Sequence, residues 1–175
     1  MKVSRSTIPA DSLLNQYLPA DYFDVFECDI DSRYPFSPDD ILINFWTDFP
    51  GWVNVLFAIR NFLVKIVGLK TDRNDPEEFK RCIREGKECG LTSVPAKNEK
   101  ETVMLLSDKH LNAYLSAYIQ KDASPHTQRI SVTTLVHFNK KLGNIYFFFI
   151  KPFHQLIVMS MLKRNLKKMM KASHF

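Results

Sequence analysis

The stretch RISVTTLVHFNKKLGNIYFFFIKPFHQLIVMSMLKRNLKKMM, residues 129–170, decides the fold of this chain. Its first part, 129–138, is rich in β-branched and apolar side chains and predicts a strand. The polar connection after it ends in Gly143, which predicts a hairpin turn with a positive φ at its last residue. The run IYFFFI at 145–150 then predicts a second strand, apolar on both faces, which is either buried on both sides or lines an interior.

Pro152 marks the expected start of a long helix, because proline is favoured in a first helical turn and disrupts a helix interior. We expect this helix to run to about Lys171, with an apolar stripe along its length formed by Val158, Met159, Leu162, Leu166, Met169 and Met170. Its other side is apolar only in the first half, at Phe153, Leu156, Ile157 and Met161. In the second half that side carries Lys163, Arg164, Lys167, Lys168 and Lys171. The helix should therefore be buried all round at its start and half-solvated at its end.

A membrane-spanning segment is the alternative for residues 145–162, whose length lies near the lower limit for a transmembrane helix. That segment contains Lys151, Pro152, His154 and Gln155. A charge at the centre of a bilayer costs about 2.5 kcal/mol or more, so a strand, a proline and a helix account better for these residues.

The chain before this stretch predicts a helix pair and several antiparallel strands. Residues 1–20 read as an irregular arm with a helical turn at 11–17, and 22–30 as a first strand. Ser37, Pro38 and Asp40 form a helix start, with Ser37 as the N-cap and Asp40 bonding back to it. A second helix is expected from about Pro50 to Val67, so that two helices meet at a tight corner.

The middle of the chain is charged over residues 71–90, which we expect to be mobile apart from a short helix at 76–85 capped by Asp75 and ended by Gly86. Strands follow at 91–96, 101–106 and 110–120, the last with clean two-residue alternation.

Composition excludes several classes of protein. With 175 residues, 45% hydrophobic and 13% aromatic, the chain should form one domain, 1–175, with a real core. A net charge of +5 without a reading motif argues against nucleic acid and allows at most weak contact with anionic membranes. The start lacks a signal-peptide core, and Cys28, Cys82 and Cys89 have no paired spacing. We therefore expect reduced thiols, no zinc site and a cytoplasmic location.

This order of elements predicts an α+β fold in which a curved antiparallel β-sheet grips a long C-terminal helix, with a helix pair inserted after the first strand. The chain resembles the START-like helix-grip (SRPBCC) superfamily, and more closely a bacterial family of unknown function grouped near it. The residues that carry the resemblance are FPGWV at 49–53, IRN at 59–61, GLK at 68–70, DKHL at 108–111, VHFN at 136–139 with LG at 142–143, and IKPFH at 150–154. The resemblance implies a fold and no activity.

Candidate ligand contacts come from elements that would border a cavity between sheet and helix. Tyr114 and Tyr118 share one face of their strand, and their hydroxyls suit a mostly apolar pocket if that face points inward. If it points outward, they belong to a solvated sheet face. The other candidates are Tyr146, Phe148, His137, Phe153 and Arg60; Arg60 would bind an anionic ligand group or form a surface ion pair.

Catalytic chemistry has little support in the sequence. His110, His137 and His154 show no spacing typical of a metal site, so we expect each to bond local groups. Asp108 with His110 would form an acid–base pair, although a turn aspartate more often bonds its own backbone. We assign no catalytic residue, no metal and no cofactor.

Three functions follow from these observations. The first is binding of an apolar or amphipathic small molecule in the cavity between sheet and C-terminal helix. The second is an enzyme of the cyclase or hydrolase type that uses this cavity, which would need converging His or Asp groups. The third is a peripheral membrane or protein-interaction module that uses the basic end of the last helix. A filled cavity with an exposed apolar rim would favour the third.

Overall fold

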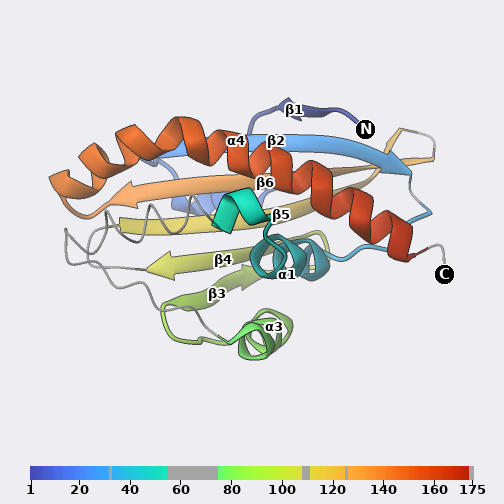
Figure 1. Ribbon diagram of the computed structural model, residues 1–175, viewed down its shortest axis with the longest axis horizontal. Helices are drawn as coiled ribbons and strands as arrows, with labels where there is room; N and C mark the ends of the chain where they lie inside the picture. Colours follow the sequence, from blue (N-terminus) through green and yellow to red (C-terminus); the bar gives the residue numbers. More distant parts are fainter. Residues whose placement is uncertain (32, 55–74, 108–110, 125, 174–175) are drawn as a thin grey trace.

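The computed structural model describes residues 1–31, 33–54, 75–107, 111–124 and 126–173. Six antiparallel strands form one curved sheet in the order β1-β2-β6-β5-β4-β3, and one long helix, α4, crosses a face of it (Figure 1). The strands are β1 (Val3–Arg5), β2 (Tyr22–Asp31), β3 (Thr92–Lys97), β4 (Glu101–Ser107), β5 (Leu111–Ser124) and β6 (Thr127–Phe138). The predicted α+β class is confirmed.

The strands from β3 to β6 form a meander in which each pairs with the next along the chain. β2 then joins the free side of β6, with Phe26 opposite Val132. Because side chains alternate along each strand, this register puts Phe26, Val132 and Ala117 on one face, where they belong to the buried core. The three-residue strand β1 lies in the segment that the sequence predicted to be irregular.

The first helices begin where the sequence predicts. α1 (Pro38–Thr47) has a full capping box, since Ser37 Oγ accepts from the Asp40 amide and Asp40 Oδ2 accepts from the Ser37 amide. Residues 51–54 are helical, which starts the second member of the helix pair. The rest of that predicted helix, to Val67, lies outside the described residues.

α3 (Pro76–Glu85) has the predicted bounds, with Asp75 at its N-cap and Gly86 in the left-handed conformation at φ 67°. A short 3-10 helix, η1 (Leu13–Tyr17), is capped by Ser12 within the expected helical turn. It belongs to the N-terminal arm, residues 6–20, which packs on the face of the sheet opposite α4.

The prediction for residues 139–152 is wrong. There is no hairpin at Gly143 and no strand at 145–150; α4 (Lys141–Ala172) runs as one helix through this stretch, with Pro152 inside it. The proline is exposed and supplies no amide hydrogen to the helix. None of the helices among the described residues has both the length and the apolarity that a membrane crossing requires.

A helical period explains why the helix forms despite the β-rich composition. Gly143, Phe147, His154, Val158 and Met161 fall on one side of a helix, and all five are buried or half-buried there. As a strand, 145–150 would place Phe147 and Phe149 on one face and Phe148 on the other. As a helix it buries Phe147, 9% exposed, and leaves Phe148 73% exposed.

The core lies between the inner side of α4, the helix α1 and one face of the sheet. Its α4 members are Val158, Met161, Leu162, Leu166 and Met169. These residues include most of the predicted apolar stripe, which is confirmed for the second half of the helix. The first half is not buried all round, because its outer side is exposed.

Candidate functional site

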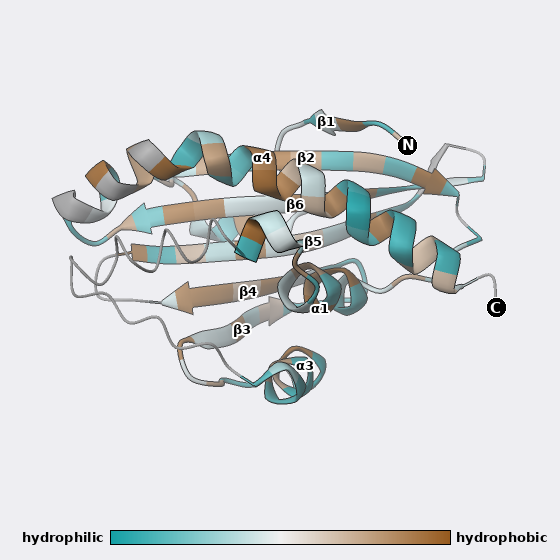
Figure 2. Cartoon of the chain, in the orientation of Figure 1, coloured by the Kyte–Doolittle hydropathy of each residue, from teal (hydrophilic) through white to brown (hydrophobic). Residues whose placement is uncertain are grey.

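The outer side of α4 carries a solvent-facing stripe that changes character along its length. The first half exposes four large apolar side chains, at 59%, 73%, 54% and 59% of their surface for Ile145, Phe148, Phe153 and Leu156. The second half exposes Lys163, Lys167 and Lys171 on the same side. Figure 2 shows teal, hydrophilic segments recurring along this second half. We call these seven residues the outer stripe.

Two other basic residues of α4 are held by α1 instead. Lys168 Nζ lies 2.8 Å and Arg164 Nη1 3.2 Å from the Asp48 carboxylate, at the end of α1. The hydrogen bond from Lys168 lowers the pKa of Asp48, against the raising effect of its partial burial. The predicted basic face is thus divided: Arg164 and Lys168 tie two helices together, whereas the three lysines of the outer stripe have no ion pair in the described part of the chain.

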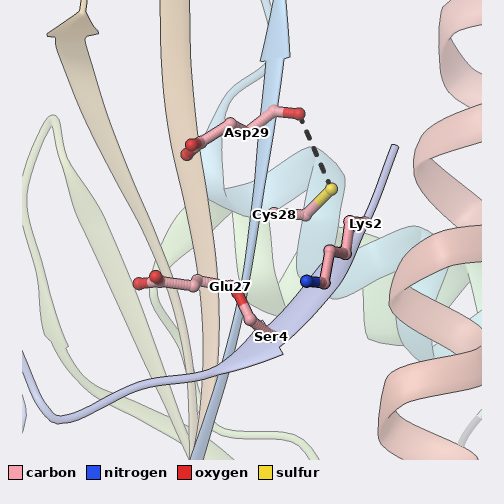
Figure 3. A pocket seen from close by; sticks show the side chains of 5 residues that line it. All are labelled: Lys2, Ser4, Glu27, Cys28 and Asp29. Atoms are coloured by element: carbon pink, nitrogen blue, oxygen red, sulfur yellow. Dashed lines mark hydrogen bonds between the residues drawn. The ribbon is translucent and has the colours of Figure 1, made fainter.

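A groove of about 370 Å³ opens between the N-terminal strand and α4. Its helix wall consists of residues at positions i, i+3, i+4 and i+7, and its lining is Met1, Lys2, Val3, Leu156, Met159, Ser160 and Lys163. A second hollow, of about 250 Å³, lies on the other side of β1 and is lined by Lys2, Ser4, Glu27, Cys28 and Asp29 (Figure 3). Neither of these two hollows lies between the sheet and the inner side of α4.

The inner side of α4 instead covers a polar cluster. His154 Nε2 lies 3.1 Å from the Thr134 hydroxyl and 3.6 Å from Asp24 Oδ2. Asp24 Oδ2 accepts a hydrogen bond of 2.6 Å from Tyr22, and the Tyr22 hydroxyl accepts one of 2.9 Å from Gln155. Burial, and then the bond to Asp24, raises the pKa of Tyr22. The cluster fixes the rotation of α4 on the sheet.

An acid–base role for this cluster would need access for a substrate. His154 and Asp24 converge, which the sequence did not predict, but neither lines one of the two hollows. The other Asp24 oxygen, Oδ1, is buried and has no hydrogen-bond partner among the described residues. The sequence signal for this cluster is Asp24, a charged residue that lies between Tyr22 and Phe26 on the otherwise apolar face of β2.

The opposite face of the sheet holds the N-terminal arm through a buried carboxylate. Glu101, 1% exposed, accepts hydrogen bonds from Ser12 Oγ at 2.8 Å, from the Leu13 amide at 2.6 Å and from Ser116 Oγ. These bonds anchor η1, and Leu14 beside them is fully buried. The carboxylate is therefore occupied by structural contacts.

Tyr114, Tyr118 and His137 lie on this arm face, away from α4. Tyr114 stacks on Tyr17 at 4.2 Å between ring centroids, and His137 Nε2 lies 3.0 Å from the Tyr17 carbonyl oxygen. Tyr118 donates a hydrogen bond of 2.8 Å to Asp11. Their face is neither the wall of an inner cavity nor an open sheet surface, because the arm covers it.

The other candidate contacts lie elsewhere. Phe148 and Phe153 both belong to the outer stripe. They therefore lie on one side of α4, away from the candidate residues on the arm face. The side chain of Tyr146, and Arg60, Asp108 and His110 as a whole, lie outside the described residues. The lysine at position 2 and the strand around Val3 were missed, because a three-residue strand gives too short a pattern to detect.

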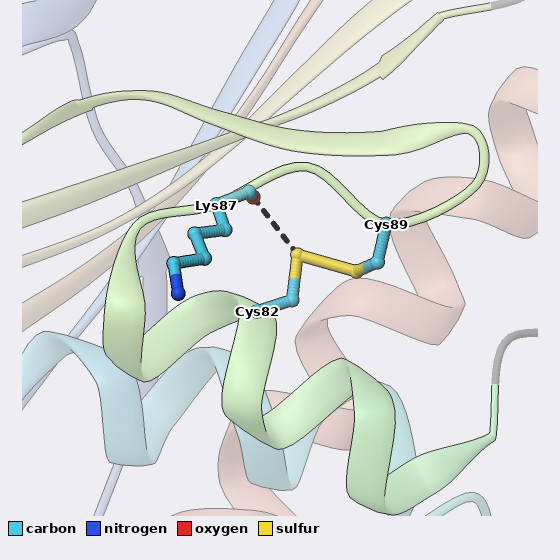
Figure 4. The surroundings of a disulfide bond; sticks show 3 residues. All are labelled: Cys82, Lys87 and Cys89. Carbon is cyan, nitrogen blue, oxygen red and sulfur yellow. Dashed lines mark hydrogen bonds between the residues drawn. A yellow bond between two sulfur atoms is a disulfide. The ribbon is translucent and has the colours of Figure 1, made fainter.

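The cysteine prediction is wrong for two of the three thiols. Cys82 and Cys89 form a disulfide, and the Cys82 sulfur also lies 2.9 Å from the Lys87 carbonyl oxygen (Figure 4). Gly86 reverses the chain after α3 and brings the two Cα atoms to 6.2 Å. The argument from cysteine number to a reducing compartment therefore does not hold. Cys28 is a buried free thiol, and burial raises its pKa.

Metal binding has no support in the described ranges, where no three His, Cys, Asp or Glu side chains are arranged to hold an ion. No curated protein and no solved structure matches the chain. A family model described as "Protein of unknown function (DUF2867)" matches residues 17–161, which include every strand after β1 and most of α4. Because that match spans well over half of the sequence, the chain belongs to this family of proteins of unknown function.

Proposed function

We propose that the protein docks peripherally on anionic lipid surfaces through the outer stripe of α4. The observation that carries this proposal is the composition of the stripe, which has exposed Phe and Leu along one half and lysines along the other. Helices that lie in a membrane interface combine an apolar face with lysine or arginine, and bind by burying the first and attracting anionic headgroups with the second.

Charge complementarity favours a lipid surface over a protein partner. The outer stripe contains three lysines, and α4 contains no acidic residue; Lys151 adds a further positive charge on the same helix. A stripe whose charges are all positive fits a surface that is uniformly negative. The apolar half, from Ile145 to Leu156, extends about 17 Å along the helix. That length gives several side chains simultaneous access to the headgroup boundary.

The expected binding energy comes from two sources. Each lysine near an anionic surface contributes about 1 kcal/mol at low salt. Complete burial of a Phe or Leu side chain contributes about 1.5–3 kcal/mol, and the half-exposed side chains of the outer stripe contribute part of that. The sum predicts reversible attachment that weakens as salt screens the lysines.

Sedimentation with phosphatidylcholine liposomes, with and without phosphatidylserine, tests the proposal. The wild-type protein should co-sediment with the anionic liposomes at low salt and much less at high salt. The Lys163→Gln/Lys167→Gln variant should bind about 30-fold more weakly, since about 2 kcal/mol is lost. The Phe148→Ser variant should also bind more weakly, and without a change in salt dependence.

Matched controls lie away from α4. Lys80→Gln/Lys87→Gln removes the same charge from the region of α3, and Phe23→Ser removes a 48% exposed phenylalanine from β2. Both controls should bind like the wild type. If a control lost as much liposome binding as its matched variant, binding would depend on net charge or on nonspecific hydrophobic contact instead of on the outer stripe. Absence of binding to anionic liposomes at low salt would remove the proposal.

A small-molecule ligand is a second candidate function, which the amphipathic groove between β1 and α4 supports. The enzyme alternative has less support, because His154 and Asp24 line neither hollow. The similarity to the START-like superfamily, a bacterial source and a cytoplasmic location remain predictions from the sequence.

A further inference from the structure

We infer that the groove between β1 and α4 binds one single-chain anionic amphiphile, such as a fatty acid carboxylate. This inference goes beyond attachment to a surface, because it concerns one ligand molecule in a defined site. It rests on the way the groove is held open, on its lining and on its charge.

The two walls of the groove are anchored independently of each other. β1 is fixed by its pairing with β2, with Val3 opposite Cys28 and Arg5 opposite Phe26. α4 is fixed by its buried inner side. Between them, the Arg5 guanidinium donates to the Gln155 side-chain oxygen and lies 5.9 Å from the Phe26 ring centroid. This contact sets the spacing of strand and helix at one end, and the groove begins at the next helical residue, Leu156.

The lining combines apolar walls with the ammonium group of one lysine side chain. Val3, Leu156 and Met159 supply apolar surface, with Met1 beside them, and Ser160 supplies a hydroxyl. Lys163 supplies the ammonium group from the helix wall, and the lining contains no acid. Lys2 belongs to the strand wall, and its side chain points to the opposite face of β1, toward the hollow that it shares with Ser4 and Glu27 (Figure 3). A volume of about 370 Å³ lies within the range of small-molecule sites.

The positive charge that lines the groove has no carboxylate as an ion-pair partner in the described part of the chain. Neither Lys2 nor Lys163 lies within ion-pair distance of a carboxylate there. On the other side of β1, Lys2 shares a hollow with Glu27 and Asp29. Arg129, which lies 3.9 Å from Glu27 and 2.7 Å from Asp29, balances only one of these two negative charges. The ammonium group of Lys163 beside an apolar wall favours an anion that carries an apolar chain.

Calorimetric titration with dodecanoate, below the concentration at which it forms micelles, tests this site. Dodecanoate should bind with a stoichiometry of one. Dodecyltrimethylammonium, which has the same chain and the opposite charge, and butyrate, which has the same head and a short chain, should bind at least tenfold more weakly. Lys163→Gln should weaken dodecanoate binding about fivefold, and Met159→Gln should weaken it without affecting butyrate. Lys2→Gln, which changes a side chain on the opposite face of β1, should bind dodecanoate like the wild type.

Three comparisons make the result decisive. Lys80→Gln should bind dodecanoate like the wild type, and circular dichroism should show that every variant is folded. Phe148→Ser, which belongs to the outer stripe but not to the groove, should lose liposome binding and keep dodecanoate binding. Equal affinity for the two twelve-carbon ligands, several molecules bound per chain, or unchanged binding in Lys163→Gln would overturn the inference even if liposome binding persists.

Discussion

Replacing Glu101 should release the N-terminal arm from the sheet. The Glu101 carboxylate is 1% exposed and accepts three hydrogen bonds, two of them from Ser12 and Leu13 in the arm. The third comes from Ser116 on β5. In Glu101→Ala, all three donors lose their charged acceptor within a buried space.

The magnitude follows from the number and the kind of these bonds. A hydrogen bond to a charged group contributes about 1.5–3 kcal/mol, but part of that loss is recovered when the arm moves and its donors reach water. We therefore expect Glu101→Ala to lower the free energy of unfolding by about 3–5 kcal/mol. Glu101→Gln should cost less, about 1–3 kcal/mol, because its oxygen still accepts from the hydroxyls while its amide opposes the Leu13 N–H.

Urea denaturation measures the change in stability, and hydrogen exchange of the amides at 11–17 reports the arm itself. Glu78→Gln, an exposed carboxylate on α3, is the matched control and should stay within about 0.5 kcal/mol of the wild type. The reasoning fails if Glu101→Ala costs less than about 1 kcal/mol while the arm amides stay protected.

Three further predictions concern titration and thiols. Desolvation raises the pKa of Asp40, but hydrogen bonds from the Ser37 hydroxyl and amide and from the Arg84 guanidinium outweigh it, so the pKa is lowered. The contribution of Asp40 to stability should therefore be complete above the pKa of the carboxyl in the unfolded chain and be lost as pH falls through its pKa in the folded protein. Acid denaturation of Asp40→Asn should show a smaller pH dependence than that of the wild type. Burial and Asp11 raise the pKa of Tyr118 to about 12, so phenolate absorbance should show it ionising well above free tyrosine. In denaturant, a thiol reagent should detect one cysteine per chain without reductant and three with it, since Cys82 and Cys89 are paired; three without reductant would contradict the disulfide.

Local sequence signals predicted both ends of α3 and the start of α1 to the residue. α3 begins at Pro76 and ends at Glu85 because its cap, its proline and its terminal glycine all lie within a few residues of it. The capping box of α1 is local in the same way. Such contacts depend only on neighbours in the chain, so the sequence contains all the information needed to place them.

The stretch at 139–152 failed because its signals conflict. Six apolar residues in a row fit either a buried strand or a helix, and periodicity cannot separate the two over so short a run. Pro152 then suggested a boundary, although an exposed turn tolerates it. The choice between strand and helix depends on whether Phe147 and His154 can both contact the same residue of the sheet, Tyr22. That contact is tertiary and cannot be read from neighbouring residues in the chain.

The candidate site was least predictable because it depends on which elements meet. The exposure of Phe148 follows from helix geometry that the strand prediction excluded. The placement of Tyr114 under the arm depends on Glu101 and η1, which are distant in sequence. The groove requires β1 beside α4, and three residues of strand carry no pattern of their own.

The pairing of β2 with β6 has a consequence for the order in which the chain can fold during synthesis. β2 leaves the ribosome early, whereas Val132, opposite Phe26, leaves only after the whole β3–β5 meander. The hairpins of that meander can form as soon as they emerge, since each strand pairs with its neighbour. Until β6 appears, β2 has only β1 beside it, and its apolar side chains at Phe26, Cys28 and Ile30 remain available to other chains. A nascent chain that stalls before residue 127 should therefore depend on chaperones more strongly than the finished protein does.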